Sequence, residues 1–341
     1  MAIPKPGGPY CVGSITHELV DAGRVVHLAS EALGRRLLLK VWYPAASTTT
    51  RPELLWAELR RDARTPLPIR LLLRCLRVRT ATVPCAAISP LVTASQLVIY
   101  NHGLISFRAE NTSLMEELAS HGYTVLAIEH ADQLAERRAL ARGGSGGKRP
   151  AREELERKLR VASAHERAKL APQYFAGADT TNRIVIARSA DTSFVMDNAS
   201  AALAAIPGLR PDSVDTMAPH LVGLSLGGAV ATVTAERDSR ARSVANLDGG
   251  MYGSRNAREI HVPYLMMYSA ANEGINDRLL PDHAQRVAPV GTTHLNYHDA
   301  AALLPVLRYL RASGSTNAAA FVAQRNLTVR EFLSASPFLK L

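Results

Sequence analysis

Short apolar runs alternate with amphipathic segments along most of the chain. The apolar runs predict buried strands, and they lie at 36–43, 96–100, 123–129, 219–224, 242–247, 262–268 and 287–290. Apolar residues recur at helical spacing in the segments 111–121, 189–205, 226–237 and 299–312. Strands that alternate with helices in this way predict an α/β fold, in which helices cover both faces of a mostly parallel central sheet.

Two segments rich in basic residues interrupt this alternation. The first, 51–79, has leucine-rich stretches around Pro66 and Pro68, which predicts a pair of short helices. The second, 136–169, overlaps a helix predicted at 151–170. That helix is supported by pairs of opposite charge four residues apart, namely Glu153–Arg157, Glu154–Lys158 and Glu156–Arg160.

The net charge of the chain is confined to these two segments. The 341 residues include 40 Lys and Arg against 30 Asp and Glu, a formal net charge of +10. Segment 51–79 holds eight arginines against three acidic residues, and 136–169 holds eleven basic residues against five glutamates. We weigh two interpretations, a solvated surface and the steering of an anionic substrate. Because the segments lack interleaved aromatic residues, a nucleic-acid partner is not expected.

Composition excludes several broad classes of protein. Hydrophobic residues make up 47% of the chain and charged residues 21%, which is typical of a folded globular protein. No run of about 18 apolar residues occurs, so no integral membrane contact is expected. The first ten residues have no apolar signal core, so we expect a cytoplasmic protein. Cys11, Cys75 and Cys85 have no metal-ligand spacing, and reduced thiols are expected.

The strongest motif is Gly-Leu-Ser-Leu-Gly-Gly at 223–228. It follows a predicted strand and opens a helix of small residues, which is the setting of a nucleophile elbow. A serine on so tight a turn has strained backbone geometry, and neighbours without a Cβ allow the close packing. The turn lifts the hydroxyl above the sheet at a helix N-terminus, which favours developing negative charge. Ser225 is therefore the predicted nucleophile.

A nucleophilic serine needs a base, which a carboxylate holds in turn. In this kind of sheet the order along the chain is Ser, acid, His, and the histidines after Ser225 are His261, His283, His294 and His298. His294 lies in the loop after the last predicted strand, where the base belongs, and His298 is its nearest rival. His283 is expected in an amphipathic helix and His261 before a strand, where histidines are more often structural. His294 and His298 could bind a metal, but no third ligand accompanies them.

The position of the acid is open on sequence alone. Asp248 ends one predicted strand, whereas Glu273 and Asp277 follow the next strand. All three positions lie at carboxyl ends of strands, as the acid requires.

An oxyanion hole needs two backbone N–H groups aimed at the tetrahedral oxygen. One should come from Leu226, the residue after the nucleophile. The other is predicted to come from Leu104, in the glycine-containing turn after the strand at 96–100. His102 in the same turn is interpreted as a structural histidine rather than a second acid or base.

Beyond these motifs, the chain resembles the platelet-activating-factor acetylhydrolase-like, or dienelactone-hydrolase-type, serine esterases of the α/β-hydrolase superfamily. The similarity spans about residues 8–312 in a shared order. Its motifs are GPY at 8–10, VG at 12–13, VWYP at 41–44, NHGL at 101–104, LASHGY at 118–123, EHAD at 129–132, DTSFVMD at 191–197, GLSLGG at 223–228, NLDG at 246–249 and GTTHLNY at 291–297.

The resemblance implies an α/β-hydrolase fold with helical cap insertions, and it decides for Asp248 over Glu273 as the acid. It implies Ser225 as nucleophile, Asp248 as acid, His294 as base, and Leu104 and Leu226 as oxyanion donors. No metal and no organic cofactor is required. The two basic segments fall where this group carries variable caps.

We therefore expect a single hydrolase domain over 1–341, with cap or lid insertions at 51–93 and 131–182. Gly249 and Gly250 stand where relatives often carry bulkier residues after the acid, which predicts a roomier pocket.

The predicted function is a serine hydrolase that cleaves or transfers an acyl ester through an acyl-enzyme. The expected substrate is a small or medium ester or lactone, and an anionic or carrier-protein-bound form of it is part of the hypothesis. An acyltransferase, thioesterase or cyclase of a biosynthetic pathway would use the same triad. A non-catalytic binding protein on this scaffold would not need the full set of residues. The oligomeric state is left open.

Overall fold

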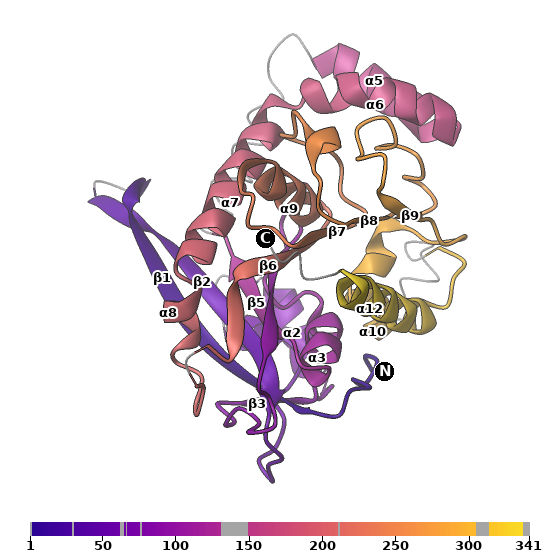
Figure 1. The fold of residues 1–341 in the computed structure, drawn as a ribbon. Coiled ribbons are helices and arrows are strands. Elements are labelled where there is room, and N and C mark those ends of the chain that lie inside the picture. The colour runs from indigo at the N-terminus through magenta and orange to yellow at the C-terminus, as the bar shows by residue number, and fades with distance from the viewer. Residues whose placement is uncertain are drawn as a thin grey trace.

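The computed structural model describes residues 2–28, 31–61, 65, 67–75, 77–130, 149–210, 212–304 and 314–336. Within these residues a nine-stranded sheet runs through the molecule in the order β3-β1-β2-β5-β4-β6-β7-β8-β9 (Figure 1). The strands are β1 (Cys11–Leu28), β2 (Glu31–Ala45), β3 (Thr82–Pro84), β4 (Ser95–Asn101), β5 (Thr124–Glu129), β6 (Val214–Leu224), β7 (Ser243–Leu247), β8 (Tyr264–Met267) and β9 (Gln285–Val287).

Helices connect and cover these strands. They are α1 (Ala57–Arg61), α2 (Leu67–Cys75), α3 (Thr112–Ser120), α5 (Arg149–Val161), α6 (Ala164–Ala176), α7 (Asp179–Asp197), α8 (Ala199–Leu203), α9 (Leu226–Arg237), α10 (Ala300–Leu303) and α12 (Ala318–Ala335). Two 3₁₀ turns accompany them, η1 (Ala257–Glu259) and η2 (His294–Tyr297).

The sheet is parallel from β5 through β9, and β2 joins it antiparallel. β1 and β2 form a long antiparallel hairpin, β2 pairs antiparallel with β5, and the short β3 runs parallel to β1. The pairs β5–β4, β4–β6, β6–β7, β7–β8 and β8–β9 are all parallel. The predicted α/β fold with a mostly parallel sheet is therefore confirmed.

Both faces of the central strands are buried, which explains their continuous apolar runs. Along β4, Leu97 and Ile99 belong to one core cluster, whereas Val98 and Tyr100 belong to another, as alternation across a strand requires. The first cluster is covered by side chains of α7, α8 and α9. The second is covered by α3 and α12, which contact each other.

The helix predicted at 151–170 is two helices in the structure. α5 ends at Val161 and α6 begins at Ala164, because Ser163 caps the second helix. Ser163 Oγ accepts the Glu166 N–H at 3.3 Å, and the Glu166 carboxylate accepts the Ser163 N–H at 2.9 Å. This reciprocal capping box favours a new helix start over continuation of the first helix.

The ion pairs of α5 differ in part from those predicted. Glu154 contacts Lys158 at 3.5 Å as expected, but it also binds Arg157. Glu156 pairs with Arg152 instead of Arg160.

Several other element boundaries were predicted wrongly. The helix expected at 189–205 starts earlier, as α7, and is interrupted at Asn198 before α8. His283 lies in a turn and not in an amphipathic helix. Of the helix expected at 299–312, the structure contains α10, and residues 305–312 lie outside the described residues. The two short helices expected within 51–79 are present as α1 and α2.

The two basic segments lie in different places. Helices α5 and α6 lie side by side above α9 and the loops that follow β7 and β8 (Figure 1). By contrast, α1 lies near the β1–β2 hairpin, where its residues Ala57 and Arg60 line a separate groove with Lys40. The assignment of 51–93 and 131–182 as insertions in a single domain stays a prediction. Among the described residues, no helix is both long enough and apolar enough to cross a bilayer.

Candidate active site

Ser225 lies at the turn between β6 and α9. Its backbone adopts φ 56° and ψ −121°, a strained conformation for a residue with a Cβ. A Cβ on Gly223 would lie 2.1 Å from the carbonyl oxygen of Gly227, and one on Gly227 would lie 1.9 Å from that of Asn101. The Ser225 N–H donates to the carbonyl of Leu247 at 2.8 Å. Glycine is therefore required at both positions for this turn to pack.

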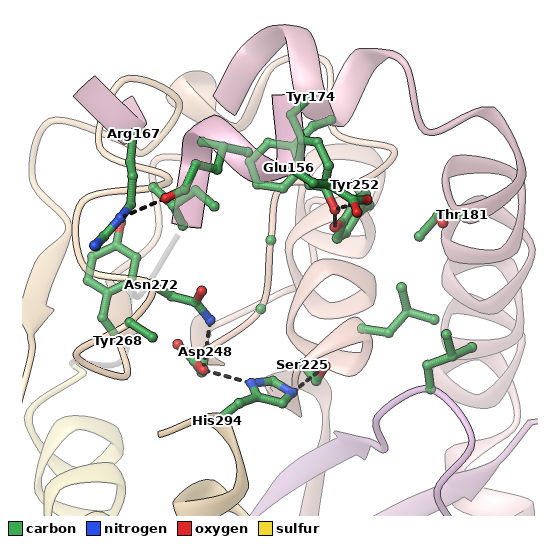
Figure 2. A pocket seen from close by; sticks show the side chains of 18 of the residues that line it. Glu156, Arg167, Tyr174, Thr181, Ser225, Asp248, Tyr252, Tyr268, Asn272 and His294 are labelled. Atoms are coloured by element: carbon green, nitrogen blue, oxygen red, sulfur yellow. Dashed lines mark hydrogen bonds and ion pairs between the residues drawn. The ribbon is translucent and has the colours of Figure 1, made fainter. Parts of the chain in front are cut away.

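The side chains of Ser225, His294 and Asp248 form one hydrogen-bonded chain (Figure 2). His294 Nε2 lies 2.9 Å from Ser225 Oγ, and His294 Nδ1 lies 2.6 Å from Asp248 Oδ2. A neutral imidazole that donates its Nδ1–H to the carboxylate presents the Nε2 lone pair to the hydroxyl. The structure thus brings together Ser225 and His294, which the sequence motifs predicted, and Asp248, which the family resemblance implied as the acid.

Asp248 is fixed by donors on both carboxylate oxygens. Its Oδ1 accepts the Ser269 N–H at 2.6 Å, and its Oδ2 accepts a hydrogen bond from Asn272 Nδ2 at 3.0 Å. The side chain is completely buried, whereas that of His294 is 51% exposed. Asn272 was not identified from the sequence, since nothing in its local pattern marks it.

His294 is electrostatically suited to gain a proton. Burial lowers its pKa, but the hydrogen bond and negative charge of Asp248, together with the charge of Glu110, outweigh burial and leave the pKa raised. The imidazolium that forms when His294 takes a proton is therefore stabilised.

The rival residues from the sequence lie elsewhere or are held in other contacts. Asp277 accepts the Tyr268 hydroxyl at 2.9 Å, and Glu273 is exposed. His298 accepts the Ala300 N–H on its Nδ1 at 2.9 Å. Burial, with the charges of Arg325 and His294, lowers the pKa of His298 to about 3. His298 is therefore a neutral structural histidine.

The loop that follows β4 passes directly beside Ser225. A Cβ on Gly103 would lie 3.5 Å from the Cβ of Ser225, and Leu104 and Leu226 both line the cavity above the serine. Their roles as oxyanion donors stay predictions at this point.

Glu110 is a buried carboxylate of this site that the sequence analysis missed. Its Oε1 accepts the Gly103 N–H at 2.9 Å and the Tyr100 hydroxyl at 2.7 Å, and its Oε2 lies 4.0 Å from His298 Nε2. Burial raises its pKa to about 7, against the effect of these hydrogen bonds. Glu110 therefore contacts the loop on one side of Ser225 while its charge acts on His294 on the other.

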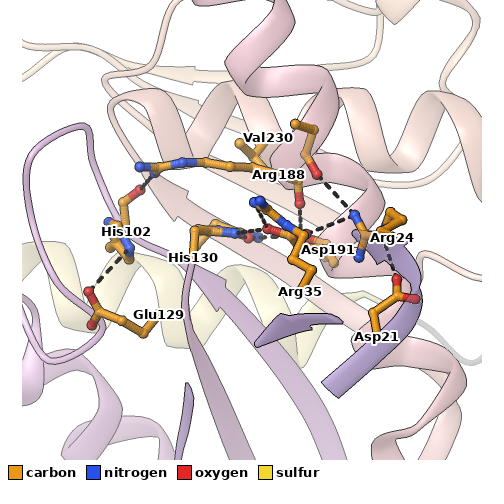
Figure 3. A network of polar contacts seen from close by, with 12 residues as sticks. Asp21, Arg24, Arg35, His102, Glu129, His130, Arg188, Asp191 and Val230 are labelled. Carbon is orange, nitrogen blue, oxygen red and sulfur yellow. Dashed lines mark hydrogen bonds and ion pairs between the residues drawn. The ribbon is translucent and has the colours of Figure 1, made fainter. Parts of the chain in front are cut away.

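A second group of charges holds the same loop from behind (Figure 3). Asp191 of α7 is fully buried and binds Arg35 at 2.5 Å, Arg24 at 2.8 Å and His130 Nδ1 at 2.9 Å. His130 Nε2 in turn lies 3.1 Å from Asn101 Oδ1. Although burial raises its pKa, the hydrogen bonds and charges of His130 and Arg35 hold the pKa of Asp191 well below the ordinary value.

The backbone of His102 is part of this network. Arg188 of α7 donates to its carbonyl oxygen at 3.2 Å, and its ring Nδ1 lies 2.6 Å from the carbonyl oxygen of Gly103. Burial and the charge of Arg188 lower the pKa of His102 well below its ordinary value. A neutral, fully buried imidazole supports the interpretation of His102 as structural.

The His294 loop is anchored from α12, which the sequence analysis left nearly uninterpreted. Arg325 is completely buried and donates to the carbonyl of Tyr297 at 2.6 Å and to Asn111 Oδ1 at 2.8 Å. It also pairs with Asp299 at 3.1 Å. The guanidinium thus holds Tyr297 and Asp299, which follow His294 along the chain.

A cavity of about 580 Å³ opens above Ser225 and is lined by residues of α5 and α6. Tyr174, Phe175 and Tyr252 form one aromatic wall, in which Phe175 and Tyr252 meet edge to face with centroids 4.8 Å apart. A Cβ on Gly250 would lie 2.6 Å from Phe175. The room expected beside this glycine is therefore filled by aromatic rings.

Comparisons with known proteins show the family to which the chain belongs. The family model for platelet-activating factor acetylhydrolase, isoform II, matches residues 1–335. The platelet-activating factor acetylhydrolase of Cavia porcellus is 26% identical over 315 residues, which cover 87% of this chain and 69% of that protein. The one of Bos taurus is 26% identical over 246 residues, 64% of this chain and 52% of that protein. The chain thus spans about half the length of the Bos taurus relative.

A solved structure shares the fold across nearly the whole chain. It is a ferulic acid esterase from Streptomyces cinnamoneus, with a TM-score of 0.71, 21% identity, and coverage of 98% of this chain and 92% of that one. The fold and the family match define a carboxylic-ester hydrolase with the α/β-hydrolase fold. Within that class, the chain belongs to the platelet-activating factor acetylhydrolase, isoform II, family, which confirms the resemblance drawn from the sequence.

Proposed function

We propose that this chain cleaves an acyl ester through a covalent acyl-enzyme on Ser225. The observation that carries the proposal is the hydrogen-bonded chain from Ser225 Oγ through His294 to Asp248, with distances of 2.9 and 2.6 Å, at the floor of a cavity. These distances lie within the reach that proton transfer requires.

In the first half of the reaction, Ser225 Oγ attacks the ester carbonyl while His294 Nε2 takes the hydroxyl proton. Asp248 holds the Nδ1–H tautomer and stabilises the imidazolium. The tetrahedral oxygen accepts hydrogen bonds from the N–H groups of Leu104 and Leu226. When the tetrahedral intermediate collapses, the C–O bond to the alcohol breaks and His294 gives its proton to the departing alkoxide.

In the second half, water enters and His294 takes its proton as the oxygen attacks the acyl-enzyme. The ester bond to Ser225 then breaks, the acid leaves, and the serine regains its proton. An alcohol or thiol in place of water would give acyl transfer through the same residues, and an internal alcohol would give a lactone.

The substrate class that we propose is a small or medium carboxylic ester. The cavity of about 580 Å³ has room for such a molecule, and the names of the relatives support ester cleavage, since they are acetylhydrolases.

The test is the variant Ser225→Ala, compared with Ser200→Ala on an exposed turn of α8 as the matched control. Hydrolysis of 4-nitrophenyl acetate should fall by about 10⁶-fold in Ser225→Ala and stay at the wild-type rate in Ser200→Ala. A fluorophosphonate probe should label wild type and the control at Ser225, as read by peptide mass spectrometry. Folded wild-type protein that neither turns over esters nor takes the label would refute the proposal.

The reaction products distinguish hydrolysis from acyl transfer to an alcohol or a thiol. Reactions run with added primary alcohols or thiols should still give mainly the free acid. A transesterified product in excess of the acid at millimolar acceptor would instead assign acyl transfer.

A further inference from the structure

The wall of the cavity that faces the cap carries two arginines, Arg160 from α5 and Arg167 from α6. The Arg167 side chain descends from α6 along the cavity, as Figure 2 shows. Its Nε donates to the carbonyl of Leu159 at 3.3 Å, and its NH1 donates to that of Glu273 at 3.0 Å. These neutral acceptors fix the guanidinium in place and leave its charge intact.

Three cations of α5 have carboxylate partners on their own helix. Arg152 pairs with Glu156, and Arg157 and Lys158 pair with Glu154. Among the residues that the structure describes, neither Arg160 nor Arg167 forms an ion pair with a carboxylate, and both line the cavity. Within the same residues, the exposed Lys169 of α6 also has no such pair, but it does not line the cavity.

The carboxylates that line the cavity are already engaged. Glu156 is bound by Arg152 at 3.4 Å and by the Tyr174 hydroxyl at 3.2 Å. Asp248 accepts hydrogen bonds from His294, Ser269 and Asn272. Neither carboxylate contacts Arg160 or Arg167, so these two guanidinium groups are the cationic side chains of this end of the cavity that have no carboxylate partner among the described residues.

Guanidinium groups bind carboxylate and phosphate oxygens through strong, directional hydrogen bonds. These bonds strengthen where apolar walls exclude part of the solvent, and the aromatic wall of Tyr174, Phe175 and Tyr252 lines the same cavity. The chemistry at this end of the cavity fits an oxyanion group held at a distance from the reacting carbonyl.

We propose that Arg160 and Arg167 form an anion subsite, which takes a carboxylate or phosphate group of an ester whose carbonyl lies at Ser225. The subsite rests on the proposed function of Ser225. It makes the preferred substrate an ester with an apolar body and one anionic end.

Matched ester pairs test the subsite. 4-Acetoxybenzoate and its methyl ester differ by a carboxylate on the alcohol side, and mono-4-nitrophenyl glutarate and 4-nitrophenyl pentanoate differ by a carboxylate on the acyl side. Because the alcohols of the first pair also differ as leaving groups, each kcat/KM ratio is divided by the ratio of the spontaneous hydrolysis rates. In wild type, kcat/KM should favour the anionic member of one pair by about tenfold. In Arg160→Gln/Arg167→Gln that preference should disappear, and each single variant should lose part of it.

Arg157→Gln is the matched control, because Arg157 lies on the same helix and is already paired with Glu154. It should keep the wild-type preference. The pair of esters that shows the preference identifies whether the anion belongs to the acyl or the alcohol part.

Binding to Ser225→Ala, measured by calorimetry, separates the subsite from the chemistry. The anionic ester should bind more tightly than the uncharged ester of the same pair. Adding Arg160→Gln and Arg167→Gln to this variant should remove the difference. An active wild type with no anion preference in kcat/KM or in binding would overturn the subsite alone. An inactive, unlabelled wild type that still binds the anionic ester more tightly would overturn the proposed function and support the subsite.

Discussion

The two sides of Ser225 are held by different physical means. On one side, His294 is half exposed and is oriented through a single buried carboxylate, that of Asp248. On the other side, Asn101, His102 and Gly103 are buried completely or nearly so, and charged groups from distant elements hold them. The base must exchange protons with entering and leaving molecules, whereas oxyanion donors act best when they are fixed before the reaction begins.

The difference in burial also implies that substitutions on the two sides change the unfolding free energy by different amounts. Asp191 binds three partners, Arg35, Arg24 and His130, and removal of the charge of a buried carboxylate weakens its contacts with all three. On the His294 side, solvent can replace part of what a substitution removes. We therefore expect substitutions on the His294 side to affect the rate, and substitutions behind the loop at 101–104 to affect stability.

Among the substitutions that test this comparison, the largest effect is expected for Asp248→Asn. The amide offers an N–H where the Nδ1–H of His294 needs an acceptor, so the imidazole takes the wrong tautomer. The value of kcat for 4-nitrophenyl acetate should fall by about 10⁴-fold. Glu273→Gln, the rival acid, should keep the wild-type kcat. A large loss in Glu273→Gln together with an active Asp248→Asn would reverse the assignment.

The next effect is expected for Asp191→Asn and concerns stability. The unfolding free energy in urea at pH 7 should fall by about 3–5 kcal/mol, because the fully buried side chain of Asp191 no longer supplies a negative charge to its partners. Asp197→Asn is the matched control on α7, since the Asp197 side chain is 59% exposed where it pairs with Arg240. It should change stability by less than about 1 kcal/mol.

The same pair of variants has a distinct pH dependence. The folded-state pKa of Asp191 is depressed, so its contribution to stability is complete above about pH 4 and is lost as the pH falls further. The gap in unfolding free energy between wild type and Asp191→Asn should therefore narrow in acid. A gap that is constant from pH 7 to about pH 3 would show that the charge of Asp191 does not carry the effect.

The smallest effect is expected for Glu110→Gln, which links the two sides. The amide keeps an oxygen for the Gly103 N–H but removes a charge that raises the pKa of His294. Because His294 must be neutral to accept the serine proton, kcat/KM rises with pH as His294 deprotonates. The acid limb of the kcat/KM profile should move to lower pH by less than about one unit.

Glu116→Gln is a close control for this variant. Burial raises the pKa of Glu116 to about 7, as it does for Glu110, but Glu116 binds Thr82 and Ala81 and not the loop beside Ser225. The acid limb of the kcat/KM profile of Glu116→Gln should coincide with that of wild type. An equal shift in both variants, or a shift of Glu110→Gln to higher pH, would contradict the assigned coupling.

The comparison of the two sides also explains what the sequence could predict. Ser225 and His294 were found because a glycine-rich turn after an apolar strand, and a histidine after the last strand, are local patterns. The central strands were found because burial on both faces makes them continuous apolar runs. In these cases the physical cause acts within a few neighbouring residues.

The supporting charges could not be found in this way. Asp191 meets His130 and Arg35 across separations of 61 and 156 residues, and Arg325 meets Asn111 across 214. No local pattern records such pairs, because they exist only once the sheet has formed. The break between α5 and α6 is different, since Ser163 followed by Glu166 is a capping pattern visible in the sequence. It was hidden by the strong helical charge pattern around it.

Arg325 also gives the enzyme an order of assembly. Helix α12 follows the strands of the sheet along the chain, so its buried guanidinium is the last of these groups to leave the ribosome. We therefore expect the loop that carries His294 to become fixed only after α12 has been synthesised and Arg325 has docked against Tyr297 and Asp299.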